Sequence, residues 1–506
     1  MNTTIIEKFA ETLERYPDKC AVVQDDRRVT FAELGSLSAK LQKTISAGTS
    51  IKKKIIGVLL PKSLELVAAD LAILSGGAAF MNLDCKLPAA RIGAVISHVE
   101  PFAIITNTEL AEKYRTCFGA SLVYCIDQID VANMNVALSL HVEDMIDTDP
   151  FCVINTSGST GTPKAVILNQ LSFYDFLAWT DEVYGLDFNE IIGCLSPVYF
   201  DHFVFEICFM MFRGATLVLL DAKYAAFPME LLKKVKSEQV SFIFWVPTIM
   251  VNIANQKLLD EIELPAVKRV WFAGEVFPTK QFNYWFDKLP QAQFTNLYGP
   301  TETSVDCTYY ILQNKLDENE SLPIGYPCHN TDILILNDEN LPCGPMEEGE
   351  LCVRGSSLAL GYYNDLDRTQ KAFTQNPLNT KYPERIYRTG DIVYRKNDGT
   401  IMFIGRKDSL IKHSGYRIEL GEIEHILVNR CGLAKNCCAV YPKTKKEIVM
   451  FYEADEEIDR VTFHKELSKF LPKYMIPKIF IRKESMPQNP NGKIDRHKLT
   501  MEAEQQ

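Results

Sequence analysis

Short runs of apolar residues alternate along most of the chain with stretches whose apolar residues recur at helical spacing. Strands that are apolar throughout are buried on both faces, and helices between such strands are typical of parallel sheets covered on both sides. The clearest strand-like runs are KIIGVLL at residues 54–60, FAIITN at 102–107, ATLVLLD at 215–221 and VSFIFWV at 240–246. The pattern therefore predicts a large α/β body built from helix-covered parallel sheets.

Two helices are predicted from the residues that precede them. Thr4 and Glu7 have the spacing of a capping box, in which each side chain bonds the backbone N–H of the other residue, ahead of an amphipathic stretch. Thr30 and Glu33 repeat this spacing ahead of a helical stretch at residues 34–41. We expect both segments to be helical.

The pattern of residues changes after about Gly344, where short strand-like runs separated by glycine turns predict a β-rich subdomain. Residues 406–412 (RKDSLIK) are polar and suggest a hinge. The last hundred residues are expected to form a small α+β unit, with a helix near Leu420, another across residues 461–470, and a polar loop at 489–498. The predicted division is a large N-terminal core at 1–405, a hinge at 406–409 and a small mobile C-terminal domain at 410–506.

Charge and cysteine content limit the possible classes of function. The 506 residues carry a net charge of −11, which argues against a dedicated nucleic-acid binder. The 14 cysteines include no CxxC pair, and scattered thiols are typical of a reducing compartment. The N-terminus lacks the apolar core of a signal peptide, and no apolar run reaches 18 residues. We therefore expect a cytoplasmic protein with no membrane span.

A stretch rich in small and hydroxyl residues, TSGSTGTPK at residues 156–164, follows the apolar run at 152–154. Small residues let the backbone approach phosphate oxygens, hydroxyls donate to them, and Lys164 adds a positive charge. Ala165 follows the lysine, so the stretch is not the common G-x-x-x-x-G-K-[ST] loop. A flexible surface turn is the alternative interpretation.

The second candidate is NLYGPTE at residues 296–302. Here Tyr298 could stack on a base, Thr301 could bond a phosphate, and Glu302 could bind Mg²⁺, which prefers carboxylate and phosphate oxygens. The alternative is a tight Gly-Pro turn that ends a strand.

Three further polar turns carry single candidate groups. They are YRTGD at residues 387–391, FIGRKD at 403–408 and NPNGKIDR at 489–496. Asp391 is suited to a ribose diol, Arg406 to a phosphate or a ribose, and Lys493 stands on a turn near the C-terminus. Each of the three could equally be an ordinary solvated residue.

Taken in order, these five segments resemble the core motifs of the adenylate-forming superfamily, which includes acyl-CoA synthetases, luciferases and the adenylation domains of nonribosomal peptide synthetases. The resemblance covers nearly the whole chain and is far more specific than any single motif. It implies ATP and Mg²⁺ as cofactors.

The resemblance also assigns roles. It implies that Lys493, Thr301 and Glu302 are catalytic, that Glu302 holds Mg²⁺, and that Asp408 is the hinge. The residues implied to bind ATP are Thr156, Ser157, Gly158, Ser159, Thr160, Gly161, Lys164, Gly274, Asn296, Leu297, Tyr298, Gly299, Pro300, Thr301, Asp391, Phe403, Arg406 and Lys493.

Within the superfamily the chain resembles the branch that activates amino acids. In that branch the aspartate of the FD pair meets the substrate ammonium group, and in YFDHFVFE at residues 199–206 this aspartate is Asp201. A capping role for Asp201 is the alternative. The positions implied to surround the substrate are Asp201, His202, Phe205, Phe244, Trp271, Ala273, Leu297, Val305 and Asp306.

The size and polarity of these positions predict the kind of substrate. Phe205, Phe244 and Trp271 are large, and filled space excludes a bulky substrate, so we expect an amino acid between alanine and proline in size. His202 and Asp306 are polar and leave two interpretations open. They could bond each other and shape the pocket floor, which we favour, or they could recognise a polar tip on the substrate.

Among amino-acid enzymes, FAGEVFPTKQF, NLYGPTETSVDCTYY and GYRIELGEIE are similar to the stand-alone ligases that load D-alanine or L-proline onto a separate carrier protein. Ala165 departs from the glycine usual in the family. The resemblance implies adenylate formation with Lys493 in place, followed by transfer to a phosphopantetheine thiol with the loop around Gly415 facing the site. An acyl-CoA synthetase and a catalytically inactive binding homologue are the alternatives.

Overall fold

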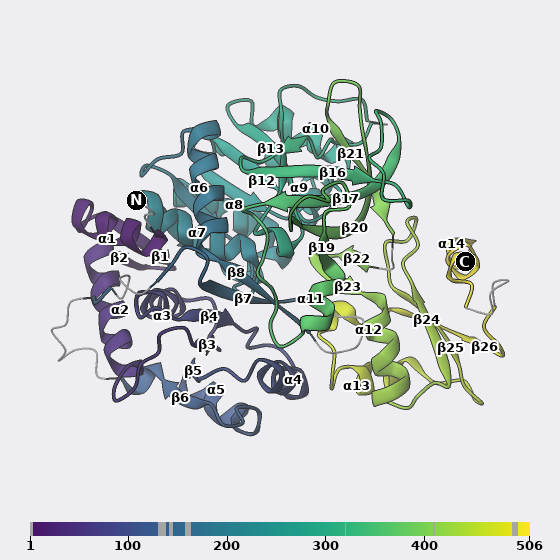
Figure 1. Cartoon of the computed structure of the whole chain (residues 1–506), viewed down its shortest axis with the longest axis horizontal. Coiled ribbons are helices and arrows are strands. Elements are labelled where there is room, and N and C mark those ends of the chain that lie inside the picture. Colours follow the sequence, from purple (N-terminus) through teal and green to yellow (C-terminus); the bar gives the residue numbers. More distant parts are fainter. Residues whose placement is uncertain are drawn as a thin grey trace.

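The computed structural model describes residues 4–129, 138–140, 145–156, 163–318, 320–407, 410–487 and 494–505. Figure 1 shows a large body of sheets and helices, with the small C-terminal domain at one side of it. In the described ranges no helix combines the length and the apolar character needed to cross a bilayer.

The first sheet of the body has seven strands within the described residues, in the order β18-β8-β7-β4-β3-β5-β6. Its strands are β3 (Ile55–Val58), β4 (Ala79–Asn82), β5 (Ala103–Thr106), β6 (Leu122–Cys125), β7 (Pro150–Thr156), β8 (Lys164–Asn169) and β18 (Gly361–Tyr362). Every residue of β3, β4 and β5 is buried, and these strands are parallel, as the continuous apolar runs predicted for β3 and β5.

The second sheet has nine strands within the described residues, in the order β15-β14-β13-β12-β11-β9-β10-β1-β2. Its strands are β1 (Cys20–Gln24), β2 (Arg27–Thr30), β9 (Ile191–Cys194), β10 (Thr216–Leu219), β11 (Phe242–Trp245), β12 (Arg269–Phe272), β13 (Gln293–Tyr298), β14 (Thr308–Leu312) and β15 (Tyr326–Pro327). The central strands pair in parallel, and the strands at each edge pair antiparallel.

Helices lie between the two sheets and on the outer face of each. The largest apolar core joins the inner faces of both sheets to α1 (Ile5–Arg15), α2 (Phe31–Ile45), α3 (Leu64–Ser75), α6 (Gln170–Tyr184) and α7 (Asp201–Arg213). The outer face of the first sheet packs on α4 (Ala89–Val99) and α5 (Thr108–Lys113). The outer face of the second packs on α8 (Pro228–Ser237), α9 (Pro247–Asn255) and α10 (Thr279–Lys288). This confirms the predicted α/β fold class.

Both predicted capping boxes are present. Thr4 and Glu7 cap α1 reciprocally, and Thr30 and Glu33 do the same for α2. Two orphan N–H groups at each helix start are therefore satisfied by residues encoded three positions apart.

The predicted β-rich subdomain is a five-stranded sheet with β16 (Thr331–Leu336), β17 (Glu348–Gly355), β20 (Arg385–Arg395) and β19 (Phe373–Gln375) in order and β21 (Ile401–Arg406) paired to β20. Helix α11 (Leu366–Ala372) lies beside it. Arg406, at the start of the predicted hinge, is the last residue of β21, and Asp408 lies outside the described residues. The hinge and the domain boundaries stay predictions.

The small domain begins with the hairpin of β22 (Leu410–His413) and β23 (Tyr416–Glu419). Helix α12 (Leu420–His425) follows, as predicted near Leu420, and α13 (Arg460–Leu467) overlaps the second predicted helical stretch, 461–470. A three-stranded sheet of β24 (Asn436–Val440), β25 (Val449–Glu453) and β26 (Ile479–Lys483) completes the α+β unit.

The prediction of a polar loop at residues 489–498 is wrong at its end. Helix α14 (Arg496–Gln505) begins inside that range, after Asp495, whose carboxylate accepts a hydrogen bond from the Lys498 N–H at 3.0 Å. Leu499 and Ala503, one turn apart, are fully buried against the small sheet. The segment is therefore part of the core of the small domain, although Leu499 and Ala503 stand within a charged sequence.

Candidate active site

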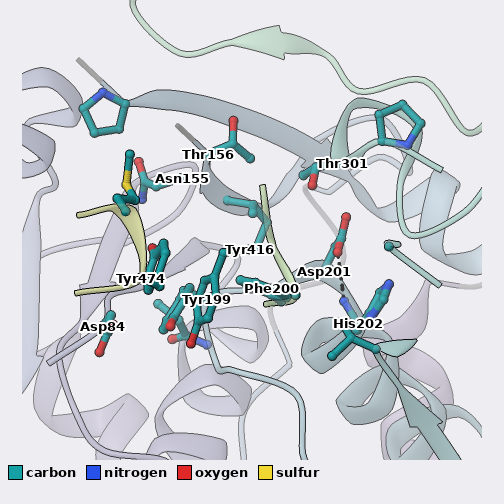
Figure 2. Close-up of a pocket in the computed structure, with 18 of the residues that line it drawn as sticks. Asp84, Asn155, Thr156, Tyr199, Phe200, Asp201, His202, Thr301, Tyr416 and Tyr474 are labelled. Atoms are coloured by element: carbon teal, nitrogen blue, oxygen red, sulfur yellow. Dashed lines mark hydrogen bonds between the residues drawn. The ribbon is translucent and has the colours of Figure 1, made fainter. Parts of the chain in front are cut away.

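A cavity opens where the carboxyl ends of the strands of both sheets meet the small domain. Ligands of open α/β sheets bind at this edge, because the loops that follow the strands converge there. Most lining residues of the body lie at or just after the ends of β4, β7, β9, β11, β12 and β13, or on α4, β20 and β21. The small domain adds Gly415, Tyr416, Tyr474 and Met475. Figure 2 shows Asp201 and His202 at one end, Asp84 and Tyr474 at the other, and Tyr199 and Tyr416 between them.

Asp201 is the first residue of α7 and is 7% exposed. Burial raises the pKa of its carboxyl to about 6, although a hydrogen bond from the Thr301 hydroxyl favours the charged form. One carboxylate oxygen also accepts from the His202 N–H at 3.0 Å. No salt bridge to Asp201 occurs among the described residues, so the carboxylate can meet a cation brought by a ligand.

Beyond Asp201, the space next to the cavity is filled with rings. The His202 imidazole stacks on Phe244, with ring centres 4.2 Å apart. Phe205 stacks on Trp271 at 5.7 Å, and Phe244 meets the same indole edge-on at 5.7 Å. Of the predicted substrate positions, Asp201 and His202 line the cavity. The remainder are buried behind them, namely Phe205, Phe244, Trp271, Ala273, Leu297, Val305 and Asp306.

The segment at residues 299–301 forms one wall, since Gly299, Pro300 and Thr301 all line the cavity. A Cβ at Gly299 would lie 2.4 Å from the Asp306 Cα, so glycine is the residue that lets the wall pack on the following loop. Asn296, a predicted ATP ligand, instead donates its side-chain N–H to the Pro323 carbonyl at 2.7 Å.

Glu302 lies behind this wall. It is fully buried, and the Tyr362 hydroxyl donates to its carboxylate at 2.8 Å. The described residues hold no cluster of three acidic, histidine or cysteine side chains that could enclose a metal. A single carboxylate next to Thr301 fits Mg²⁺, because this ion keeps waters and phosphate oxygens among its ligands.

Asp391, Arg406 and Tyr298 come together from two different sheets. The Arg406 guanidinium donates to one Asp391 oxygen at 2.9 Å, and the Tyr298 hydroxyl donates to the other. Asp391 and Arg406 line the cavity, while Tyr298 is buried beside Phe403. The arrangement fixes a charged acceptor at the cavity wall, which suits a diol.

Of the predicted phosphate loop at residues 156–164, the structure describes the two ends. Thr156, at the end of β7, and Pro163 both line the cavity, and Lys164 begins β8 with its ammonium group 6.0 Å from the Tyr362 ring centre. Gly274 lines the cavity from the loop after β12. The predicted positions outside the described residues are Ser157, Gly158, Ser159, Thr160, Gly161 and Lys493.

Several lining residues were not predicted from the sequence. Asn82 ends β4 and Asp84 follows it, Arg91 is on α4, and Tyr416 and Tyr474 come from the small domain, where their rings stack at 3.5 Å. Tyr416 lies in the stretch GYRIELGEIE, next to Gly415, which was expected to face the site, whereas no local motif marks the others. The available signal was the short apolar run AAFM at residues 78–81, directly before Asn82, which was not among the predicted strands.

The profile of the family described as "AMP-binding enzyme" matches residues 9–363. Zwittermicin A synthase ZmaJ of Bacillus cereus is 31% identical, over 99% of this chain and 95% of that protein. Tyrocidine synthase 1 of Brevibacillus parabrevis is 30% identical over 98% of this chain, which spans only 45% of the longer protein.

A solved structure shares the whole architecture. The Vibrio cholerae adenylation domain AlmE, in complex with glycyl-adenosine-5'-phosphate, superimposes with a TM-score of 0.86 at 21% identity, over 100% of this chain and 98% of that one. At this identity the likeness establishes the fold.

Proposed function

The chain belongs to the AMP-binding enzyme family, in which it is an adenylate-forming enzyme of the nonribosomal-peptide adenylation type, and on that premise we propose that its substrate is a compact amino acid. The enzyme joins the amino acid to AMP and then passes it to the phosphopantetheine thiol of a separate carrier protein.

Asp201 carries this proposal. A carboxylate that is buried at the end of the cavity is costly unless a cation meets it, and the raised pKa of Asp201 reports that cost. The α-ammonium group of an amino acid supplies such a cation. A fatty or aryl acid has no ammonium group and would leave the carboxylate unpaired.

The packed rings behind Asp201 support the proposal that the substrate has a small side chain. His202 and Phe244 are stacked, and Phe205 and Trp271 are fully buried behind them. A long side chain would have to displace packed rings, and overpacking of this kind costs about 1–3 kcal/mol. Glycine, alanine, serine and proline place few or no atoms beyond the Cβ position.

In the first half-reaction a carboxylate oxygen of the amino acid bonds to the α-phosphorus of ATP, and the bond from that phosphorus to pyrophosphate breaks. Asp391 and Arg406 hold the ribose, and Thr301 and the segment around Thr156 contact the phosphates. Glu302 would hold Mg²⁺, which would supply positive charge to neutralise the phosphates. Lys493 bridges the carboxylate and the α-phosphate, where charge develops.

In the second half-reaction the thiol sulfur bonds to the carbonyl carbon, and the bond from that carbon to AMP breaks. Gly415 and Tyr416 line the cavity in the structure, which agrees with an orientation of the small domain suited to this step. The small domain turns about Asp408 between the two steps, and Lys493 enters the site only in the first.

The test is to measure adenylate by mass spectrometry with a matched pair of acids, alanine and propionate, which differ only in the amino group. We expect alanyl-adenylate and little propionyl-adenylate, and Asp201→Asn should remove most of this preference. Asp221→Asn, at an exposed carboxylate, is the control. Equal use of propionate would indicate an acyl-CoA synthetase, and ATP binding without any adenylate would indicate an inactive homologue.

A further inference from the structure

Two charged side chains meet where the small domain contacts the body. Arg91, on α4, and Glu422, on α12, form an ion pair although they are 331 residues apart. The Arg91 side chain is 10% exposed and that of Glu422 is fully buried. Arg91 also lines the cavity, so the pair lies directly beside the candidate active site.

A second polar contact crosses the boundary at another point. Glu275, in the loop after β12, accepts a hydrogen bond from the Gly415 N–H and another from the Thr248 N–H at 2.9 Å. Between the two contacts, Phe200 of the body meets the Tyr416 ring at 5.8 Å. The small domain is thus held at two polar contacts with an aromatic contact between them.

The face of the small domain that these contacts hold to the cavity is not the face on which Ile494 and α14 pack. Ile494, next to Lys493, packs with Val440 and Phe451 on the small sheet, and it does not line the cavity. Figure 1 places α14 at the outer edge of the small domain, away from the body. A turn of the small domain that brings this other face to the cavity would separate Glu422 from Arg91.

We propose that the Arg91–Glu422 pair is an orientation latch, which holds the small domain in the arrangement used for thiol transfer. This inference rests on the two-step function proposed above. Both residues are positioning residues: they act through the placement of Gly415 and Tyr416 at the cavity.

The burial of the pair explains why it can bias the orientation. A buried pair that loses one partner leaves an uncompensated charge, which is far more costly than loss of an exposed pair. When the small domain turns away, both charges return to water and the penalty disappears. Removal of one charge therefore disfavours this orientation specifically.

The test uses Glu422→Gln, which keeps the shape of the side chain and removes its charge. We expect transfer from pre-made aminoacyl-adenylate to slow at least about tenfold, equivalent to about 1.4 kcal/mol. Adenylate formation should stay within about twofold of the unmodified enzyme, or rise. The reversed pair, Arg91→Glu with Glu422→Arg, should recover part of the transfer rate. Glu502→Gln, which breaks a pair inside the small domain, is the matched control.

Domain orientation is measured separately by fluorescence energy transfer between dyes at the exposed positions Glu112 and Lys465, attached through non-canonical amino acids because the chain has 14 cysteines. Glu422→Gln should lower the fraction of molecules that show the dye-to-dye distance of the unmodified enzyme, and Glu502→Gln should leave that fraction unchanged. An unchanged distance distribution, or equal loss of both half-reactions, would overturn the latch. An unmodified enzyme that forms no adenylate would refute the proposed function, while the distance measurement would still decide on the latch.

Discussion

At the scale of single residues, Asp201 links burial to chemistry. Its carboxyl is taken out of water at the end of a cavity, and this burial raises its pKa to about 6. The ordinary pKa of an aspartate lies near 4. The group therefore titrates close to the pH at which enzymes are assayed, and its protonation state can be read from kinetics.

The first prediction concerns the pH dependence of activation. The carboxylate must be ionised to hold an ammonium group, so kcat/KM for the amino acid should fall as pH drops through about 6. The fall should be about tenfold per pH unit, because kcat/KM follows the ionised fraction of the free enzyme. Initial rates between pH 4.5 and 8 measure it, and a profile flat down to pH 4.5 would contradict this role of Asp201.

The second prediction concerns the stability cost of this site. A carboxyl whose pKa is raised on folding prefers the neutral form, so its penalty is absent below about 3.8 and complete above about 6. Asp201→Asn should therefore raise the free energy of unfolding at pH 7.5, with an upper bound of about 3 kcal/mol from the size of the shift. Denaturant unfolding at pH 7.5 and pH 4 measures it. A gain at pH 4 as large as that at pH 7.5 would show that desolvation of the charge is not the cause.

Motif residues could be predicted from the sequence because their neighbours in the chain mark them. Thr301, Asp391 and Arg406 were found in this way, and all three line the cavity. Arg91 and Tyr474 could not be found, since each is an ordinary residue of its own element. They reach the cavity only because the fold brings α4 and the small domain to the same edge of the sheets.

At the scale of elements, the wall at residues 299–301 depends on close backbone contact. Gly299→Ala would place a Cβ 2.4 Å from the Asp306 Cα and 2.9 Å from the Cys307 nitrogen. Gly405→Ala, in β21, is the matched control, because a Cβ there meets no atom within 4 Å.

The third prediction follows from this contrast. Gly299→Ala should destabilise the protein by about 1–3 kcal/mol through overpacking and should weaken ATP binding, since Thr301 moves with the wall. Gly405→Ala should leave both nearly unchanged. Thermal unfolding and nucleotide titration measure the two effects, and wild-type ATP affinity in Gly299→Ala would contradict the placement of this segment.

Element prediction succeeded where the signal was local. The capping boxes of α1 and α2 and the buried strands β3, β5, β10 and β11 were all predicted, although each strand is shorter than its apolar run. Leu59, Leu60 and Leu220 lie just past the strand ends and are buried, so the apolar run continues there. Helix α14 was missed, since only Leu499 and Ala503 identify its buried face.

At the scale of the whole molecule, one cavity is built from two domains. The body supplies Asp201, Thr301 and Asp391, and the small domain supplies Tyr416 and Tyr474. A reaction in two steps can use such a site twice if the small domain presents a different face in each.

The fourth prediction tests this division of labour. Lys493→Ala should slow adenylate formation by orders of magnitude, since one preorganised donor in a transition state is worth about 2.7–4 kcal/mol. Transfer from chemically prepared aminoacyl-adenylate to the thiol should survive in the same variant. Single-turnover assays of each step measure this, and equal loss of both would refute separate roles for the two faces.

Domain orientation and substrate identity were the parts that the sequence left open. Orientation depends on contacts such as Arg91–Glu422, which join residues too far apart in the chain for any local pattern to reveal. The resemblance predicted the substrate positions but not their packing, because stacking of His202 on Phe244 is a property of the assembled core.

The most direct measurement is ATP–pyrophosphate exchange with a panel of carboxylic acids: glycine, serine, proline, both hands of alanine, glutamine, ornithine, phenylalanine, propionate and a fatty acid. A compact amino acid should give the strongest exchange, phenylalanine, glutamine and ornithine should give little, and the acids without an amino group should give almost none. Preference for a long polar side chain would contradict the compact pocket and point to His202 and Asp306 as the residues that recognise its tip. Exchange with the fatty acid alone would contradict amino-acid activation itself.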